Sequence, residues 1–177
     1  EGDDYWTDPL KLQKQVDFLE RNEDYSANIT NRKFDDLVNH QSYITNYPEL
    51  IRTEHILKGE VLPTQTVLFR NILKQEDFNK FNKMIAGDRV ISYLLSLKGP
   101  IHCIKDCTAI YNYTGNGVWS SKKAQNQNII NIKNLIDFHN RIGLRRGNKY
   151  IFSKLYTLIN DKINRKNNLN YRDLHRD

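Results

Sequence analysis

The sequence predicts an α/β fold with a mixed sheet in which helices outnumber strands. In several segments, apolar residues recur every three or four positions, and shorter runs rich in β-branched residues separate these segments. The 177 residues include ten tyrosines, seven phenylalanines and two tryptophans, enough for a core despite a mean hydropathy of −0.72. A chain of this length fits one domain with an appendage.

The first expected element is a helix from Asp8 to about Asn22. Asp8 is a favoured N-cap residue, and Pro9 suits the first helical position. Three apolar residues then follow at helical spacing and are expected to face the core: Leu12, Val16 and Leu19.

The middle of the chain is expected to alternate between strands, loops and helices. Its first half should contain a short strand near Ser26–Thr30, a polar loop from Arg32 to Pro48, a short helix from Thr53 to Gly59 and a strand from Leu62 to Phe69. Its second half should contain helical turns at Phe78–Ile85, a helix from Asp88 to Leu97, a strand from Ile101 to Tyr113 and a turn at Gly115–Gly117.

The last third of the chain is expected to be helical. One helix should begin at Ser120 or Ser121 and run to His139, and another should run from about Lys149 to Ile163. The apolar side of the first helix is expected to carry Ile129, Ile132, Leu135, Ile136 and His139. These expectations divide the chain into a domain at 1–120 and a basic helical extension at 121–177.

The two cysteines are expected to be reduced. Cys103 and Cys107 lie four residues apart on a predicted strand. Four residues of a strand span roughly 13 Å, well beyond the upper limit of ~7 Å between the Cα atoms of two cysteines in a disulfide.

Three carboxylates surround a glycine at the start of the chain, in Glu1-Gly2-Asp3-Asp4-Tyr5-Trp6. Carboxylates at contact distance repel one another, and a hard divalent cation relieves this repulsion. The spacing alone is equally compatible with a frayed acidic terminus. The predicted helix directly behind it favours a loop that is held in place.

The segment Glu1–Leu19 resembles the middle of bacterial family 2 glycosyltransferases, which have the GT-A fold and build surface polysaccharides. Further segments resemble the same family in order: Thr64–Asn71 its acceptor-side strand, Gly87-Asp88 its catalytic-base position, and Gly117–Ser120 the motif that closes the active site. The resemblance implies that residues 1–120 are the C-terminal half of a GT-A domain that lacks the nucleotide-binding half. On this basis the isolated chain is expected neither to bind a nucleotide sugar tightly nor to turn over.

The resemblance also implies an inverting, metal-dependent sugar transfer from a nucleotide-diphosphate donor to a hydroxyl of a glycan or lipid-linked acceptor. Mg²⁺ or Mn²⁺ would be bound by Asp3, helped by Glu1 and Asp4, and Asp88 would be the catalytic base. The residues expected at the substrate are Trp119, Arg70 and Trp6.

Each of these side chains also has a simpler role open to it. Asp88 stands where a carboxylate caps a helix, and Arg70 could pair with a nearby acid. Trp119 and Trp6 could be packing residues rather than sugar-stacking platforms. The family commonly has an arginine and a histidine for the diphosphate where this chain has Asn112 and Thr114.

Positive charge is concentrated at the end of the chain. Residues 1–121 carry 14 Lys and Arg against 17 Asp and Glu, whereas residues 122–177 carry 13 against 4. This asymmetry indicates either a solvated basic face or a surface that contacts anionic membrane, which gives a non-catalytic docking module as the alternative function. No nucleic-acid-binding motif accompanies the charge. A cytoplasmic protein is expected, with peripheral contact at the inner face of the plasma membrane.

Overall fold

The computed structural model describes residues 3–117, 121–122 and 124–143, and in them the chain forms a mixed α/β fold. The chain divides into two units, Glu1–Lys123 and Ala124–Asp177. Each unit is considered by itself.

The sheet of the first unit is built around two long parallel strands, β2 (Ala27–Asp36) and β6 (Ile101–Tyr113). Two short strands pair antiparallel with the outer edge of β6, namely β1 (Tyr5–Trp6) and β4 (Leu50–Ile51). Two others pair antiparallel with the outer edge of β2, namely β3 (Gln41–Ile44) and β5 (Leu68–Phe69). The predicted mixed sheet is therefore confirmed. Helices do not outnumber strands in the described residues, which hold six strands, four α-helices and one 3₁₀ helix.

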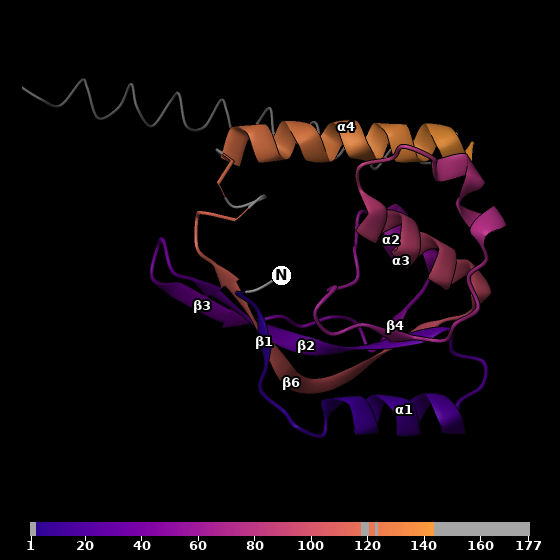
Figure 1. Ribbon diagram of the computed structural model, residues 1–177, viewed down its shortest axis with the longest axis horizontal. Coiled ribbons are helices and arrows are strands. Elements are labelled where there is room, and N and C mark those ends of the chain that lie inside the picture. The colour runs from indigo at the N-terminus through magenta and orange to yellow at the C-terminus, as the bar shows by residue number, and fades with distance from the viewer. Residues whose placement is uncertain (1–2, 118–120, 123, 144–177) are drawn as a thin grey trace, which may run out of the picture. The chain divides into compact units, whose positions relative to one another are not determined.

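Helices cover both faces of this sheet (Figure 1). Helix α1 (Lys11–Arg21) lies on one face, and α2 (Thr53–Leu57) and α3 (Gly87–Lys98) lie on the other. Because side chains alternate along a strand, β2 sends apolar Ala27 and Ile29 to the α2–α3 face and polar Asn28 to the α1 face. The apolar core therefore lies under α2 and α3, where Ile51, Ile56, Leu62, Leu95, Ile101 and Cys103 complete it.

Helix α1 packs on the sheet partly through polar side chains, and of the three residues predicted to face the core only Leu19 is buried. Lys11 and Gln15 are fully buried together with Leu19, whereas Leu12 and Val16 are 43% and 38% exposed. The Lys11 ammonium donates to Gln15 Oε1 at 2.7 Å. The Gln15 amide in turn donates to Asn28 Oδ1 at 2.8 Å and to the carbonyl of Thr66 at 2.7 Å. Hydrogen bonds therefore replace the apolar contacts that helical spacing predicted.

The same helix begins three residues later than predicted. The Asp8 carboxylate accepts a hydrogen bond from the Leu10 amide at 2.8 Å, and the Asp8 carbonyl accepts one from the Lys11 amide at 3.1 Å. Asp8 thus closes a turn of its own before the helix, a local bond that aspartate side chains commonly make.

The polar stretch 32–48, predicted as a loop, forms the second half of β2 and the hairpin strand β3. The Asp36 carboxylate fixes the turn because it accepts hydrogen bonds from the amides of Val38 and Asn39 at 3.0 and 2.9 Å. Pairing with β6 continues along β2 to Asp36. Pairing across the sheet, rather than local apolar content, makes this segment a strand.

Two further segments differ from their predictions. Only Leu68 and Phe69 of the predicted strand 62–69 are extended, because the amides of Thr66 and Val67 turn back to the carbonyl of Pro63. The predicted turns at 78–85 are a 3₁₀ helix, η1 (Gln75–Phe81). The short helix at Thr53, the helix from about Asp88 and the strand Ile101–Tyr113 are confirmed as α2, α3 and β6.

In the second unit the described element is α4 (Ala124–Ile142). It buries Leu135, Phe138 and His139, whereas Ile129 and Ile136 of the predicted apolar side are 44% and 37% exposed. The helix predicted at 149–163 and most of the basic segment proposed to contact membrane lie outside the described residues. Among the described helices, none has the length and apolar content needed to span a bilayer.

Both cysteines are free thiols, as expected, with Cys103 buried and Cys107 partly buried on β6. Burial raises the pKa of the Cys103 thiol to about 11.

His102 on β6 makes the stability of the fold pH-dependent. Its ring stacks on Phe18 of α1 at 4.1 Å and meets the edge of Tyr25, and burial lowers its pKa below the ordinary 6.5. Of the charged groups that act on the ring, Glu49 opposes this shift and Lys105 adds to it. As the pH falls below 6.5, the unfolded chain takes up this proton before the folded chain does, so the free energy of unfolding falls with pH until the folded chain is protonated too.

Replacing His102 by phenylalanine should remove this pH dependence while keeping the stacked ring. We expect urea denaturation between pH 5 and 7 to show a shallower loss of stability in His102→Phe than in the parent chain. Equal slopes in His102→Phe and the parent would contradict the assignment.

Candidate functional site

The acidic loop, of which the structure describes Asp3 and Asp4, lies at the carboxyl end of the two parallel strands. Strand β1, directly after Asp3 and Asp4, pairs with the last third of β6 through Tyr5 and Ile110. The carboxyl ends of β2 and β6 are in register there, with Asp36 opposite Tyr113. In α/β sheets, ligands bind at this edge.

Two partners fix the carboxylate of Asp4. Its Oδ1 accepts a hydrogen bond from the backbone amide of Asn112 at 3.1 Å, and its Oδ2 accepts one from the side-chain amide of Gln65 at 2.6 Å. The side-chain amide of Asn112 also donates to the carbonyl of Asp3. The loop is therefore attached to β6 and to the segment before β5, and it is not a frayed terminus over Asp3 and Asp4.

Arg32 on β2 determines which way the Gln65 amide points. Its guanidinium donates to Gln65 Oε1 and lies 4.7 Å from the centre of the Tyr111 ring. Because a guanidinium only donates hydrogen bonds, the oxygen of Gln65 must face Arg32 and the nitrogen must face Asp4. Arg32 therefore reaches Asp4 through the neutral amide of Gln65 and makes no direct salt bridge with it.

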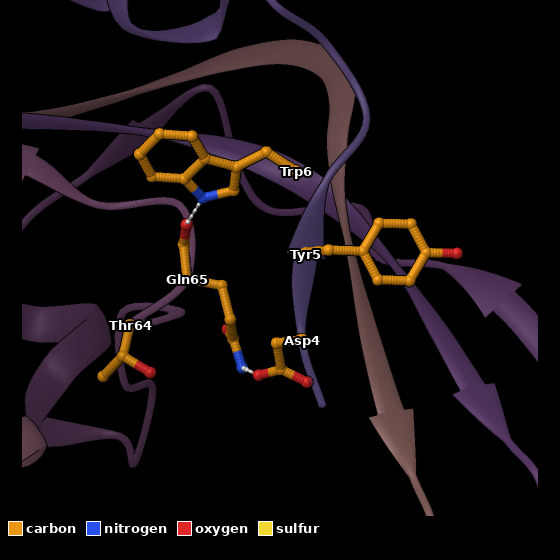
Figure 2. Close-up of a pocket in the computed structure, with 5 residues that line it drawn as sticks. All are labelled: Asp4, Tyr5, Trp6, Thr64 and Gln65. Atoms are coloured by element: carbon orange, nitrogen blue, oxygen red, sulfur yellow. Dashed lines mark hydrogen bonds between the residues drawn. The ribbon is translucent and has the colours of Figure 1, made fainter. Parts of the chain in front are cut away.

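Trp6 forms one wall of a pocket beside Asp4 (Figure 2). The indole Nε1 donates to the carbonyl of Gln65 at 2.8 Å, and the Lys11 ammonium lies 4.3 Å from the ring centre. Burial lowers the pKa of Lys11. The pocket has a volume of about 340 Å³, and the described residues that line it are Asp4, Tyr5, Trp6, Thr64 and Gln65.

Metal binding by Asp3 stays a prediction. Its side chain is exposed, and within the described residues its carboxylate makes no hydrogen bond or ion pair. Hard cations such as Mg²⁺ and Mn²⁺ take oxygen ligands of this kind. No group of three or more His, Cys, Asp or Glu side chains suited to a metal ion occurs in the part of the chain that the structure describes. Glu1, the other expected ligand, lies outside that part.

Asp88 lies in the first turn of α3 and is exposed. Its Oδ1 accepts a hydrogen bond from the amide of Arg89 at 2.8 Å, a local bond within the first turn. The N-cap position of α3 belongs to Ala86, so Asp88 is not the capping residue that the sequence allowed. The described contacts do not join Asp88 to Asp3 or Asp4. Its role as a base stays a prediction.

Arg70 has structural contacts. Its guanidinium donates to the carbonyls of Tyr25, Leu19 and Asn22, so it binds the carboxyl end of α1. The carbonyls of Leu19 and Asn22 also accept hydrogen bonds from the backbone amides of Asn22 and Tyr25, so Arg70 adds further donors at this end of the helix. Trp119 lies outside the described residues, and Thr114 accepts a hydrogen bond from the amide of Asn116 at 3.3 Å.

Three residues of the site were not assigned a role from the sequence, namely Arg32, Gln65 and Asn112. Arg32 fell in the stretch predicted as a loop, and Gln65 was part of a motif without a role of its own. Asn112 was noted only because it replaces an arginine. Gln65 lies within Thr64–Asn71, a segment that the sequence had already singled out. Its contact with Asp4, however, joins residues 61 positions apart and follows only from the fold.

Comparison with known proteins found distant relatives. No family model matches the chain. Uncharacterized proteins from two strains of Mycobacterium tuberculosis and from Mycobacterium bovis are each 25% identical to it over 126 residues. The match covers 68% of this chain and 35% of each relative, so the chain spans about a third of the length of these curated relatives.

Proposed function

We propose that the chain is part of a metal-dependent glycosyltransferase of the family 2 type. It would transfer a sugar, with inversion, from a nucleotide-diphosphate donor to a hydroxyl of a glycan or a lipid-linked acceptor. The observation that carries the proposal is the acidic loop, which Asn112 and Gln65 fix at the carboxyl edge of two parallel strands while the Asp3 carboxylate stays exposed. The order of the motifs along the chain adds support.

The residues divide the chemistry between them. Asp3, with Glu1, would hold Mg²⁺ or Mn²⁺, which supplies positive charge to the departing diphosphate. The Asp88 carboxylate would take the proton of the acceptor hydroxyl as its oxygen bonds to the anomeric carbon. The bond from that carbon to the diphosphate oxygen breaks in the same step, and the nucleoside diphosphate leaves with the electron pair.

The proposal is tested by replacing Asp3 with asparagine in the full-length gene product, because the relatives extend well beyond the matched segment. We expect Mn²⁺ affinity, measured by calorimetry, to fall together with sugar transfer from a panel of nucleotide sugars. The rate should drop roughly 100-fold or more, because Lewis-acid stabilisation is worth several kcal/mol.

Asp24→Asn is the matched control, since Asp24 is an exposed aspartate that precedes the amino end of β2. It should leave both quantities unchanged. Full transfer by Asp3→Asn, or no transfer by the parent with any donor and either metal, would refute the proposed function.

A further inference from the structure

The pocket beside the acidic loop has the composition of a carbohydrate site. It combines an exposed indole, a carboxylate, a carboxamide and a hydroxyl, contributed by Trp6, Asp4, Gln65 and Thr64. Its volume of about 340 Å³ lies at the lower end of the range for small-molecule sites. In Figure 2 the side chains of Trp6 and Asp4 lie on the Gln65 side of β1, and that of Tyr5 points away.

The indole is held as a rigid platform. Its Nε1 is fixed by the carbonyl of Gln65, and Lys11, which is 1% exposed, packs against the ring. Trp6 is nevertheless 52% exposed, so a large part of its apolar surface is open to a ligand. A fixed aromatic surface beside polar groups suits a ligand that is apolar on one face and polar at its edge, as a sugar ring is.

The polar groups retain hydrogen-bonding capacity. A carboxylate has about four acceptor positions, and Asp4 uses one on each oxygen. Gln65 Nε2 carries two hydrogens, and Asp4 takes one of them. Because Arg32 fixes the amide orientation, the contacts among the described residues leave the pocket two neighbouring acceptors on Asp4 and one donor on Gln65. Two adjacent hydroxyls of a sugar match the paired acceptors.

We propose that this pocket binds one ring of a carbohydrate, with Asp4 accepting hydrogen bonds from two adjacent hydroxyls and Trp6 stacking on the ring. The inference rests on the proposed function in one respect, that the bound ring belongs to the acceptor. It also gives the two aspartates different roles. Asp3 binds the metal ion, and Asp4 recognises the sugar.

The test uses the 177-residue chain with methyl glycosides of common hexoses, N-acetylhexosamines and 6-deoxyhexoses, in EDTA and without a nucleotide donor. Saturation-transfer NMR and Trp fluorescence should detect at least one sugar with a Kd on the order of 1–10 mM, as expected for a small ligand with few contacts. The matching deoxy sugar, which lacks one of the two adjacent hydroxyls, should bind at least about 10-fold more weakly.

Substitutions of the residues that line the pocket test whether the sugar binds there. Trp6→Ala and Asp4→Asn should each weaken binding at least about 10-fold, since each loses a contact worth more than 1.4 kcal/mol. Thr64→Val, at an exposed position, should weaken it by a smaller factor and serves if the other two fail to fold. Tyr43→Ala removes an equally exposed aromatic residue outside the pocket and should have no effect.

The proposal is overturned if no glycoside binds, if binding survives Trp6→Ala, Asp4→Asn and Thr64→Val, or if binding requires Mn²⁺. These outcomes are separate from the test of the proposed function. If the chain binds sugars in EDTA while the full-length product transfers none, the carbohydrate pocket is supported and the proposed glycosyltransferase function is refuted. If the full-length product transfers sugar but no glycoside binds to this pocket, the proposed function is supported and the carbohydrate pocket is refuted.

Discussion

Replacing Gln15 by leucine should lower the free energy of unfolding by about 3 kcal/mol or more. Gln15 is fully buried and joins α1 to the sheet through Lys11, Asn28 and Thr66. Leucine has a similar volume but would leave the Lys11 ammonium without its acceptor and two buried oxygens without their donor. Each buried polar group left unpaired costs about 1–3 kcal/mol, and a charged group costs more. Urea denaturation at neutral pH measures the change.

The same substitution at Gln13 is the matched control. Gln13 lies on the same helix but is exposed, and it bonds Asp17 at 2.6 Å. Gln13→Leu should therefore change stability by only a few tenths of a kcal/mol. Adding Lys11→Met to Gln15→Leu should recover part of the loss, because it removes the buried charge. A Gln15→Leu chain as stable as the parent would show that the polar contacts of α1 are dispensable.

Replacing Asp88 by asparagine should abolish sugar transfer in the full-length product while Mn²⁺-dependent nucleotide binding stays intact. Removal of a general base costs about 10²–10⁴-fold in rate. Asparagine keeps a side-chain oxygen that can accept the hydrogen bond from the Arg89 amide, so this local contact survives and only the basic group is lost. Transfer assays beside nucleotide calorimetry separate the two effects.

Asp77→Asn is the control for Asp88. Asp77 occupies the first turn of η1, where it accepts a hydrogen bond from the Lys74 amide at 2.8 Å, and its pKa is lowered by that bond. Its substitution should affect stability and leave turnover unchanged. Normal turnover by Asp88→Asn would contradict the assignment of Asp88 as the base and leave it as an acidic residue in the first turn of α3.

Local patterns predicted the elements that depend on local chemistry. The helix from about Asp88 ends at Gly99-Pro100, a pair of residues that commonly ends a helix. The strand Ile101–Tyr113 was predicted over its full length because its β-branched and aromatic content is typical of a strand. The position of Asp3 and Asp4 just ahead of a helix likewise followed from neighbours in the chain.

Local patterns failed where distant contacts decide the structure. Helical spacing selected Leu12 and Val16 for the core, but the sheet face beneath α1 carries Asn28, whose amide requires polar partners. The stretch 32–48 has little apolar content and still forms a hairpin, because its backbone pairs with the long edge of β6 and folds back on itself.

The sequence by itself determined the class of fold, the acidic loop and the candidate metal ligand Asp3, because each depends on residues close together in the chain. Only the tertiary structure decided what holds that loop and what lies beside it. Asn112 follows Asp4 by 108 positions and Gln65 by 61, and their hydrogen bonds to its carboxylate form only when β1 pairs with the end of β6. A pattern of neighbouring residues carries no information about contacts at that separation. The two hydrogen bonds that fix Asp4, and the pocket next to Trp6, could therefore be found only from the fold.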